Sequence, residues 1–408
     1  MMNKKTRNLH FLKDLNHRNS TSGLVAAIFV ISGPCALILE ASSNGNFTLT
    51  QTIMWVFSVY VIGGLFGIIL PLYYRIPIVG GHTLTGVAFL ATMTAQFTFN
   101  ELIGSYIVSG IFVLLIGSLG VFSRLIKLVP KEIISAMLSG MITHYMMNFI
   151  LSVNELLVVG TISLLMYLIL TKRKTNIPPV LAAILTGFII LLLMGLVNSS
   201  DAVVSPFFMP EMQLPEINLL SFLSVSIPLA ILILSNDIAV AVSALEQNKY
   251  PTPISRILTS SGVFSIIASF FGGQSANIAG MATVICSGEE AGPKEKRYMG
   301  AVVTGVLLLI FGLFSWKLIP FIQALPSEFI SIIVGFSLIG VFGNSLYQGF
   351  SNPSMKISAS FAFMIALSNI SILNISAPVW ALLVGTVIAN YVENDSNRTL
   401  MKGKKETA

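Results

Sequence analysis

The chain repeats itself, because three short motifs of its first half recur in its second half in the same order. Each motif is displaced by roughly 195 residues, a regularity that chance does not readily produce. The matched pairs are 80–83 (Gly-Gly-His-Thr) with 272–275 (Gly-Gly-Gln-Ser), 109–117 with 304–312 (Ser-Gly and Thr-Gly at the start, glycine at the end), and 130–135 (Pro-Lys-Glu-Ile-Ile-Ser) with 326–331 (Pro-Ser-Glu-Phe-Ile-Ser). Duplicated hydrophobic halves are typical of secondary transporters whose binding site lies where the two repeats meet.

Composition indicates a membrane protein with many spans. Hydrophobic residues make up 54% of the chain and charged residues only 10%, which no soluble core of this length requires. Residues 1–20 are polar and basic and lead directly into an apolar segment, so we expect no cleaved signal peptide and a first span that stays in the lipid. Cys35 and Cys286 both lie in apolar segments, where a structural disulfide is not expected.

Fourteen membrane elements, seven per half, account for the apolar segments, since a bilayer core asks for roughly 20 apolar residues per helix. The expected fold is therefore all-α. The predicted elements are 23–41, 52–72, 76–93, 102–122, 132–151, 155–171 and 179–197 in the first half, and 219–245, 253–271, 272–288, 298–319, 328–346, 356–373 and 378–391 in the second. An odd number per half makes the two halves insert with opposite orientation, which is an inverted repeat.

Basic residues support this count, because cytoplasmic loops carry most of the Lys and Arg in membrane proteins. With both termini cytoplasmic, nearly all basic loop residues fall on the inner side, Lys317 being the exception. They are Arg75, Arg124, Lys127, Lys131, Lys172, Arg173, Lys174, Lys249, Arg256, Lys294, Lys296, Arg297, Lys356, Lys402, Lys404 and Lys405. The expected segments are a cytoplasmic tail (1–20), the first repeat (21–198), an external linker (199–216) with Asp201, the second repeat (217–391) and a cytoplasmic tail (392–408). The net charge of +6 thus reports topology, and no nucleic-acid partner is expected.

The third and tenth elements are short, open with paired glycines and are rich in Thr, Ser, Asn and Gln. Unwound backbone at membrane depth is tolerated only where it is buried in protein or lines a cavity. We expect half-helices that start near Thr83 and near Ser275 and point their N-termini at each other, a geometry that attracts anions. The alternative is that the glycines only permit close helix packing.

Two ionisable residues inside the predicted membrane elements are candidates for the site. Asp237 lies within the apolar stretch 219–245, and an intramembrane carboxylate is a functional hypothesis by default, with proton coupling as a common role. Its alternative role is a structural carboxylate bound by neighbouring Ser and Asn side chains. His82 occupies, in the third element, the place that Gln274 occupies in the tenth; it is either a proton or substrate contact or a structural histidine.

No enzyme or cofactor motif is present in the sequence. Four histidines and two scattered cysteines form neither a metal-ligand spacing nor a nucleophile–base pair, and the 272–273 glycines lack the Gly-Lys-Ser/Thr of a phosphate loop. We therefore expect no metal, no cofactor and no enzymatic activity.

The stretch 271–293 resembles the BenE family of benzoate/proton symporters. The residues that carry the resemblance are Phe-Gly-Gly-Gln-Ser-Ala-Asn-Ile-Ala at 271–279, Ala-Thr-Val-Ile-Cys-Ser-Gly-Glu-Glu-Ala-Gly-Pro at 282–293, and Arg297-Tyr298. Weaker similarity covers most of the chain. The resemblance implies the fold of the uracil, ascorbate and sulfate carriers: seven plus seven inverted spans in a core and a gate domain. In that fold the third and tenth elements are each a short strand plus a half-helix, substrate binds between them with help from the eighth span, and dimers occur.

The chain also differs from the family pattern at two places. The eighth span has Ser-Asn-Asp-Ile at 235–238 where relatives commonly carry Gln-Asn followed by Pro-Gly, and the third element has Gly-His-Thr at 81–83 where relatives tend to have a Trp-Ser-Thr-like stretch.

Together these observations predict a bacterial inner-membrane symporter, moving a small organic anion, such as benzoate or another aromatic carboxylate, with a proton by an elevator-like motion. The expected substrate-binding residues are His82, Thr83, Asn236, Gln274, Ser275 and Asn277, and the expected proton-coupling residues are Asp237 and His82. Lipid is the expected surrounding and a homodimer is possible. The rival readings are a proton-coupled nucleobase transporter, in which Asp237 binds the ring directly, and an uncoupled anion channel.

Overall fold

Helices form almost all of the structure, a computed structural model that describes residues 11–122, 129–173, 178–196, 210–370, 372 and 375–393. Within these ranges seven helical segments are long and apolar enough to cross a membrane. They are α1 (His17–Asn44), α2 (Leu49–Tyr74), α4 (Phe99–Leu119), α6 (Lys131–Glu155), the segment Leu219–Gln247, the segment Lys294–Leu313 that contains α14 (Tyr298–Leu313), and α16 (Ser327–Phe350). Shorter helices are α7 (Leu157–Arg173), α8 (Pro179–Leu193), α12 (Ile254–Ser269), α15 (Ser315–Gln323), α17 (Lys356–Ser368) and α18 (Ala377–Val387).

The two irregular elements each consist of a short strand followed by a half-helix. The first is β1 (Gly80–Gly81) with α3 (Leu84–Ala91), and the second is β2 (Asn277–Ile278) with α13 (Gly280–Ser287). The strands pair antiparallel, with Gly80 opposite Ile278 and Gly81 opposite Asn277. The predicted strand-plus-half-helix architecture of the third and tenth elements is thus confirmed.

Helix α9 (Leu219–Ser221) opens the eighth span, in which two π-helical segments interrupt the α-helix. The segment continues as η4 (Phe222–Ser226), α10 (Ile227–Leu232), η5 (Ile233–Ile238) and α11 (Ala239–Gln247), and η4 and η5 are π-helical. π-Helical turns occur often at functional sites, and η5 contains Asp237.

Helix starts follow from local sequence. Thr48 and Thr98 cap α2 and α4, and each forms a capping box with the residue three positions later, which satisfies two backbone N–H groups that the helix itself cannot. Helix α2 ends at Arg75, whose φ of 54° is left-handed. The following Pro77 cannot continue a helix, so the chain enters β1 in extended form.

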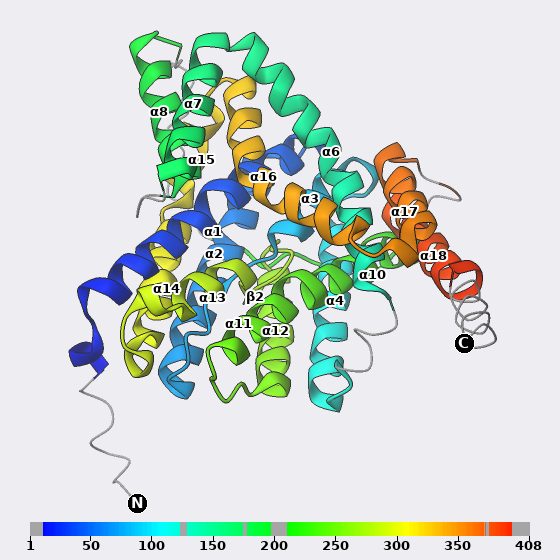
Figure 1. The fold of residues 1–408 in the computed structure, drawn as a ribbon, viewed down its shortest axis with the longest axis horizontal. Helices are drawn as coiled ribbons and strands as arrows, with labels where there is room; N and C mark the ends of the chain where they lie inside the picture. The colour runs from blue at the N-terminus through cyan, green and yellow to red at the C-terminus, as the bar shows by residue number, and fades with distance from the viewer. Residues whose placement is uncertain are drawn as a thin grey trace, which may run out of the picture.

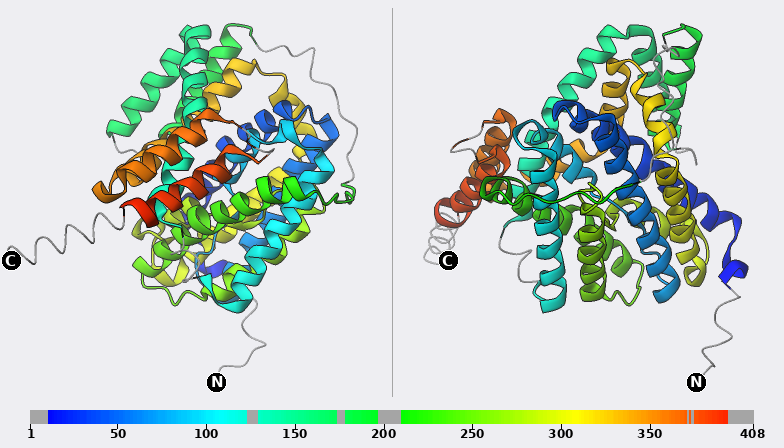
Figure 2. Two further views of the ribbon diagram at one scale, coloured as in Figure 1. Left: turned by 90° about the vertical axis from the view of Figure 1, so that its right-hand side faces the viewer. Right: turned by 180° about the vertical axis from the view of Figure 1, so that it is seen from behind.

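The helices form two bundles that lie side by side (Figures 1 and 2). The core bundle consists of α1, α2, α3 and α4 with the Leu219–Gln247 segment, α12, α13 and α14, and the gate bundle consists of α6, α7 and α8 with α16, α17 and α18. The contacts are symmetric under exchange of the halves: α4 packs on α12 as α2 packs on α14, and α6 packs on α16. This exchange is the inverted repeat that the duplicated motifs predict.

One predicted equivalence is wrong: the glycine pairs do not correspond in the two repeats. Gly80 and Gly81 form β1, whereas Gly272 follows the end of α12 with a left-handed φ of 88°. The N–H of Gly273 donates to the carbonyl of Ala268 at 3.0 Å, as in a helix C-terminal cap. The second half-helix consequently begins at Gly280, not near Ser275, and His82 does not occupy the place of Gln274.

The structure differs from one predicted element and leaves several predicted segments outside the described residues. The predicted element 298–319 is interrupted, because α14 ends at Leu313 and α15 begins at Ser315. Much of the predicted linker and both tails (199–209, 1–10 and 394–408), with Arg124, Lys127, Lys174 and Asp201, lie outside the described residues. The count of fourteen spans and the proposed segment boundaries stay predictions.

Glycines in α2 allow β1 to approach closely, which makes Gly67 a sensitive position. A Cβ atom on Gly67 would lie 2.8 Å from the backbone N of Gly80. We expect Gly67→Ala to destabilise the protein by roughly 1–3 kcal/mol, the usual cost of overpacking a core, visible as a lower midpoint of thermal unfolding in detergent.

The matched control is Gly343→Ala, also within a helix, where nothing lies within 4 Å of the added methyl group. This variant should unfold at the wild-type temperature or slightly above, because alanine favours helix by up to about 1 kcal/mol. Equal unfolding temperatures for the two variants would contradict the close approach.

Candidate functional site

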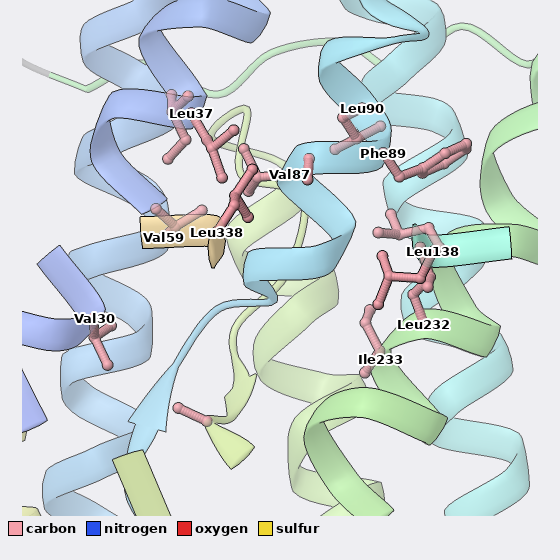
Figure 3. Close-up of a cluster of buried hydrophobic side chains, with 14 of the residues drawn as sticks. Val30, Leu37, Val59, Val87, Phe89, Leu90, Leu138, Leu232, Ile233 and Leu338 are labelled. Carbon is pink, nitrogen blue, oxygen red and sulfur yellow. The ribbon is translucent and has the colours of Figure 1, made fainter. Parts of the chain in front are cut away.

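A cavity of about 260 Å³ lies between the core and gate bundles. Its core side is formed by α1, η5 and the starts of α3 and α13, and its gate side by α6, α7, α8 and α16. Figure 3 shows how closely the bundles approach here: side chains of α3 (Val87, Phe89, Leu90) lie in one hydrophobic cluster with Leu138 of α6 and Leu338 of α16.

Asp237 places a carboxylate at the cavity wall. It is only 7% exposed, and its Oδ2 has no hydrogen-bond partner among the described residues. The side chains of Thr83 and Asn277 face the carboxylate and can hydrogen-bond to it. A buried carboxylate that is only partly satisfied is costly, and this favours a functional role over a structural one.

His82 also lines the cavity and is held by a chain of hydrogen bonds. Its Nδ1 lies 2.9 Å from Nε2 of Gln274, and the indole N–H of Trp55 donates to Oε1 of the same amide at 2.6 Å. Tyr60 packs edge-on against the imidazole with ring centroids 5.1 Å apart. His82 Nε2 is buried and has no partner in the described ranges, so the ring presents one unused nitrogen.

The two half-helices differ at their N-termini. Thr83 caps α3 by accepting from the N–H of Gly86 at 3.0 Å. No side chain of the described residues caps α13, whose first residues Gly280 and Met281 line the cavity. Since the first amides of a helix lack intrahelical partners and carry partial positive charge, α13 offers the cavity a site for negative charge.

The predicted site residues divide into two groups. His82, Asn236 and Asp237 line the cavity. The remaining four, Thr83, Gln274, Ser275 and Asn277, are fully buried behind the cavity wall. Ser275 accepts from the backbone N–H of Thr83 at 3.1 Å, so this second group supports the first and does not itself line the cavity.

Several cavity residues were not predicted from the sequence. The core contributes Phe29 from α1, and the gate contributes the aromatic rings of Tyr167 and Phe336. The gate also adds a polar group, which consists of Ser135, Ser337, Asn344, Ser345 and Gln348. Positions 337, 344, 345 and 348 follow one face of α16, and this helical spacing of polar residues within an apolar span is the signal that could have found them.

Hydrogen bonds also link the two bundles around the cavity. The Tyr145 hydroxyl of α6 donates to the carbonyl of Ala88 in α3 at 3.1 Å. The Ser376 hydroxyl, at the start of α18, donates to the carbonyl of Ser224 in η4 at 3.0 Å. No group of three or more His, Cys, Asp or Glu side chains gathers anywhere in the described part of the chain.

Comparison with known proteins identifies the family. A family described as "Benzoate membrane transport protein" matches residues 13–391. The chain belongs to this family, BenE. Among BenE relatives, the Inner membrane protein YdcO of Escherichia coli (strain K12) is 29% identical over 368 residues, covering 90% of this chain and 93% of that protein. The Benzoate membrane transport protein of Acinetobacter baylyi (strain ATCC 33305 / BD413 / ADP1) is 24% identical over 365 residues, covering 89% and 92%.

Solved structures share the fold. The transmembrane domain of the cyanobacterial bicarbonate transporter BicA aligns with a TM-score of 0.59 at 18% identity, over 91% of this chain and 97% of that one. SLC26A9 aligns with a TM-score of 0.64 at 11% identity, over 93% of this chain and 65% of that one. The BenE-family chain is therefore a multi-pass membrane transport protein and not an enzyme, and the predicted inverted-repeat fold class is confirmed.

The cavity predicts which introduced thiols are reactive. Asn344 is an exposed residue of the cavity wall, so Asn344→Cys should react with a small maleimide in detergent. The native Cys35 and Cys286 are free but buried and should react slowly. Reaction is followed by the mass of the intact protein.

The control is Ser261→Cys, because Ser261 is fully buried away from the cavity. It should stay unlabelled in the folded protein and react after denaturation. Equal reactivity at positions 344 and 261 would contradict the described cavity.

Proposed function

We propose that this BenE-family protein is a symporter that carries a small organic anion, benzoate or a related aromatic carboxylate, together with a proton. The observation that carries the proposal is the composition of the cavity. One wall combines His82, Asn236, Asp237 and the uncapped start of α13, while Phe29 and Phe336 add aromatic surface. Such a cavity suits a ligand with one charged end and one apolar ring.

In this proposal the carboxylate lies at the N-terminus of α13. Backbone N–H groups at a helix start bind anions through hydrogen bonds and the helix dipole. The Asn236 amide, whose Nδ2 lies 3.5 Å from Oγ1 of Thr85, supplies a further donor beside them. The role of the fully buried Thr83, Gln274, Ser275 and Asn277 is to hold these groups in place.

Coupling follows from the position of Asp237 next to the proposed anion site. Two negative charges in one poorly solvated cavity repel each other strongly, so the anion binds better when Asp237 carries a proton. By linkage, the bound anion favours protonation of Asp237 to the same extent. One proton then accompanies one anion. The Oδ2 atom of Asp237, which has no partner among the described residues, becomes a donor when protonated.

Transport requires a second conformation in which the site faces the other side. We propose that the core bundle moves as a unit against the gate bundle, as in an elevator, since the proposed ligand-binding groups belong mostly to the core. The bonds from Tyr145 to Ala88 and from Ser376 to Ser224 would break in that movement. The ligand drives it only through different affinities for the two states.

The relative named Inner membrane protein YdcO supports placement in the bacterial cytoplasmic membrane. We propose that both termini are cytoplasmic. Asp14, near the N-terminus, pairs with Arg75 at 3.3 Å and Lys296 at 3.6 Å. This agrees with the same-side placement that the loop charges predict for these basic residues.

The decisive experiment is uptake of labelled benzoate by liposomes containing the purified protein, with an inward proton gradient. We expect accumulation above the external concentration, and loss of that accumulation with a protonophore. Uracil and other nucleobases serve as competitors. Displacement by uracil without benzoate uptake would support the nucleobase reading, and large unitary currents would support a channel.

Asp237→Asn separates coupling from binding. The amide keeps the shape of the carboxylate but cannot exchange a proton, so we expect loss of gradient-driven accumulation while benzoate exchange or binding persists. If Asp237 instead bound a neutral ring directly, the variant would lose binding as well.

The control is Glu246→Gln, an exposed acid on α11 in the same span, which should transport like the wild type. Normal uphill uptake by Asp237→Asn would refute the assignment of Asp237.

A further inference from the structure

We propose that His82 is a fixed hydrogen-bond donor to the transported anion and not a proton carrier, and that Trp55 and Gln274 impose this role. The inference rests on the proposed function, because it names a donor for the same anion. It concerns a different property, namely which nitrogen of His82 carries the hydrogen. It also assigns a role to Trp55, which lies outside the cavity wall.

The orientation of the Gln274 amide follows from Trp55. The indole nitrogen of Trp55 lies 2.6 Å from one terminal atom of the amide, and an indole N–H only donates hydrogen bonds. That terminal atom must therefore be the oxygen. Both residues are fully buried, so no water competes for this bond, and the NH₂ group of Gln274 is turned toward His82.

The Gln274 amide in turn decides the tautomer of His82. Its NH₂ group lies 2.9 Å from Nδ1 of the imidazole, and an NH₂ group only donates. Nδ1 must accept, so it carries no hydrogen, and the neutral ring carries its hydrogen on Nε2. Nε2 is the nitrogen without a partner in the described ranges. The ring therefore presents an N–H donor that the protein leaves unsatisfied.

A second proton on His82, carried by Nδ1, would meet a donor and not an acceptor in Gln274. Protonated Nδ1 would face the NH₂ of Gln274, and turning the amide would place its NH₂ against the indole N–H of Trp55. In either arrangement two donors face each other in a buried site with no acceptor between them. Both groups would then lose their hydration without gaining a hydrogen bond, which is unfavourable. Tyr60 packs against the ring, and its hydroxyl donates to the carbonyl of Val30 at 3.1 Å. Tyr167 and Asp237 are the other titratable residues that line the cavity with His82.

These contacts give Asp237 and His82 different roles in the site. Asp237 exchanges the proton, while His82 keeps one protonation state and offers one hydrogen. A buried donor left unpaired disfavours any ligand that lacks an acceptor at that position. His82 should therefore discriminate carboxylates from ring compounds without an acceptor oxygen, independently of pH.

The direct test is solid-state NMR of the liposome-embedded protein with isotope-labelled imidazole nitrogens. The chain has only four histidines, and the difference between wild type and His82→Gln assigns the His82 signals. We expect hydrogen on Nε2 and none on Nδ1 throughout the pH range in which transport changes. Hydrogen on Nδ1, or a doubly protonated ring, would overturn the inference whether or not benzoate is a substrate.

Variants of the hydrogen-bond chain give a second readout. Gln274→Met removes the amide at similar size, and Trp55→Phe removes the indole donor while keeping an aromatic ring. Both should release the constraint, so that signals of both tautomers appear and KM for benzoate rises. A single Nε2–H tautomer in both variants would show that this chain does not impose it.

Transport by His82 variants separates donor from carrier. The amide NH₂ of His82→Gln can replace the Nε2–H donor and does not titrate, so uphill accumulation should remain protonophore-sensitive. His82→Leu offers no donor and should raise KM roughly ten- to a hundredfold, the range for one hydrogen bond to a charged group.

Loss of coupling in His82→Gln, with benzoate exchange intact, would make His82 a carrier and refute the proposal. Lack of benzoate transport by the wild type, with the NMR result as expected, would refute the proposed substrate and leave the tautomer assignment standing.

Discussion

The pairing of β1 with β2 is the interaction on which the site depends. Non-helical backbone at membrane depth must find hydrogen-bond partners within the protein, because lipid offers none. Here β1 and β2 supply hydrogen-bond partners for each other's backbone groups. Beside them, the N–H of Ala279 donates to the carbonyl of Val79 at 2.8 Å. Each half-helix begins directly after its strand, so this pairing also fixes where the two half-helices start.

Glycines in the surrounding helices leave room for the paired strands β1 and β2. A side chain on Gly63 or Gly67 would collide with the β1 backbone, and one on Gly280 would lie 2.9 Å from the carbonyls of Asn236 and Asp237. The last contact ties the start of α13 to the π-helical segment η5. The proposed anion-binding amides and the proposed proton carrier are therefore packed directly against each other. A shift in the position of one would displace the other.

Much of the fold was predictable because it follows from local chemistry and the duplication. Apolar length predicted the long helices, and Thr48 and Thr98 are residues of the type that precedes a helix start. The predicted equivalence of the two glycine pairs was wrong at Gly272. A glycine pair suits both a helix end and a strand, and sequence alone does not reveal the sign of φ. The gate residues Asn344 and Gln348 were missed because polar residues along one face of an apolar helix fit helix packing as well as a cavity.

The two repeats contribute different groups to the site, because their sequences differ where the half-helices begin. Duplication supplies two half-helices, but Thr83 caps α3, while the residue before α13 is Ala279, whose side chain cannot cap. His82 and Gln274, which occupy different structural positions in the two repeats, meet across them in one hydrogen bond. The interface between repeats therefore combines a buried histidine, an uncapped helix start and an acid, which neither half contains alone.

The movement proposed for transport would have to break the contacts between the bundles. The Tyr145–Ala88 and Ser376–Ser224 bonds join neutral groups, and each such bond contributes about 1 kcal/mol net. A further bond joins the second pair, from the N–H of Ser376 to the hydroxyl of Ser224 at 3.3 Å, and the hydrophobic cluster of Figure 3 adds apolar contacts between α3 and the gate. Buried strands and closely packed glycines hold the core together, so its internal geometry can persist in the proposed movement while its contacts to the gate exchange.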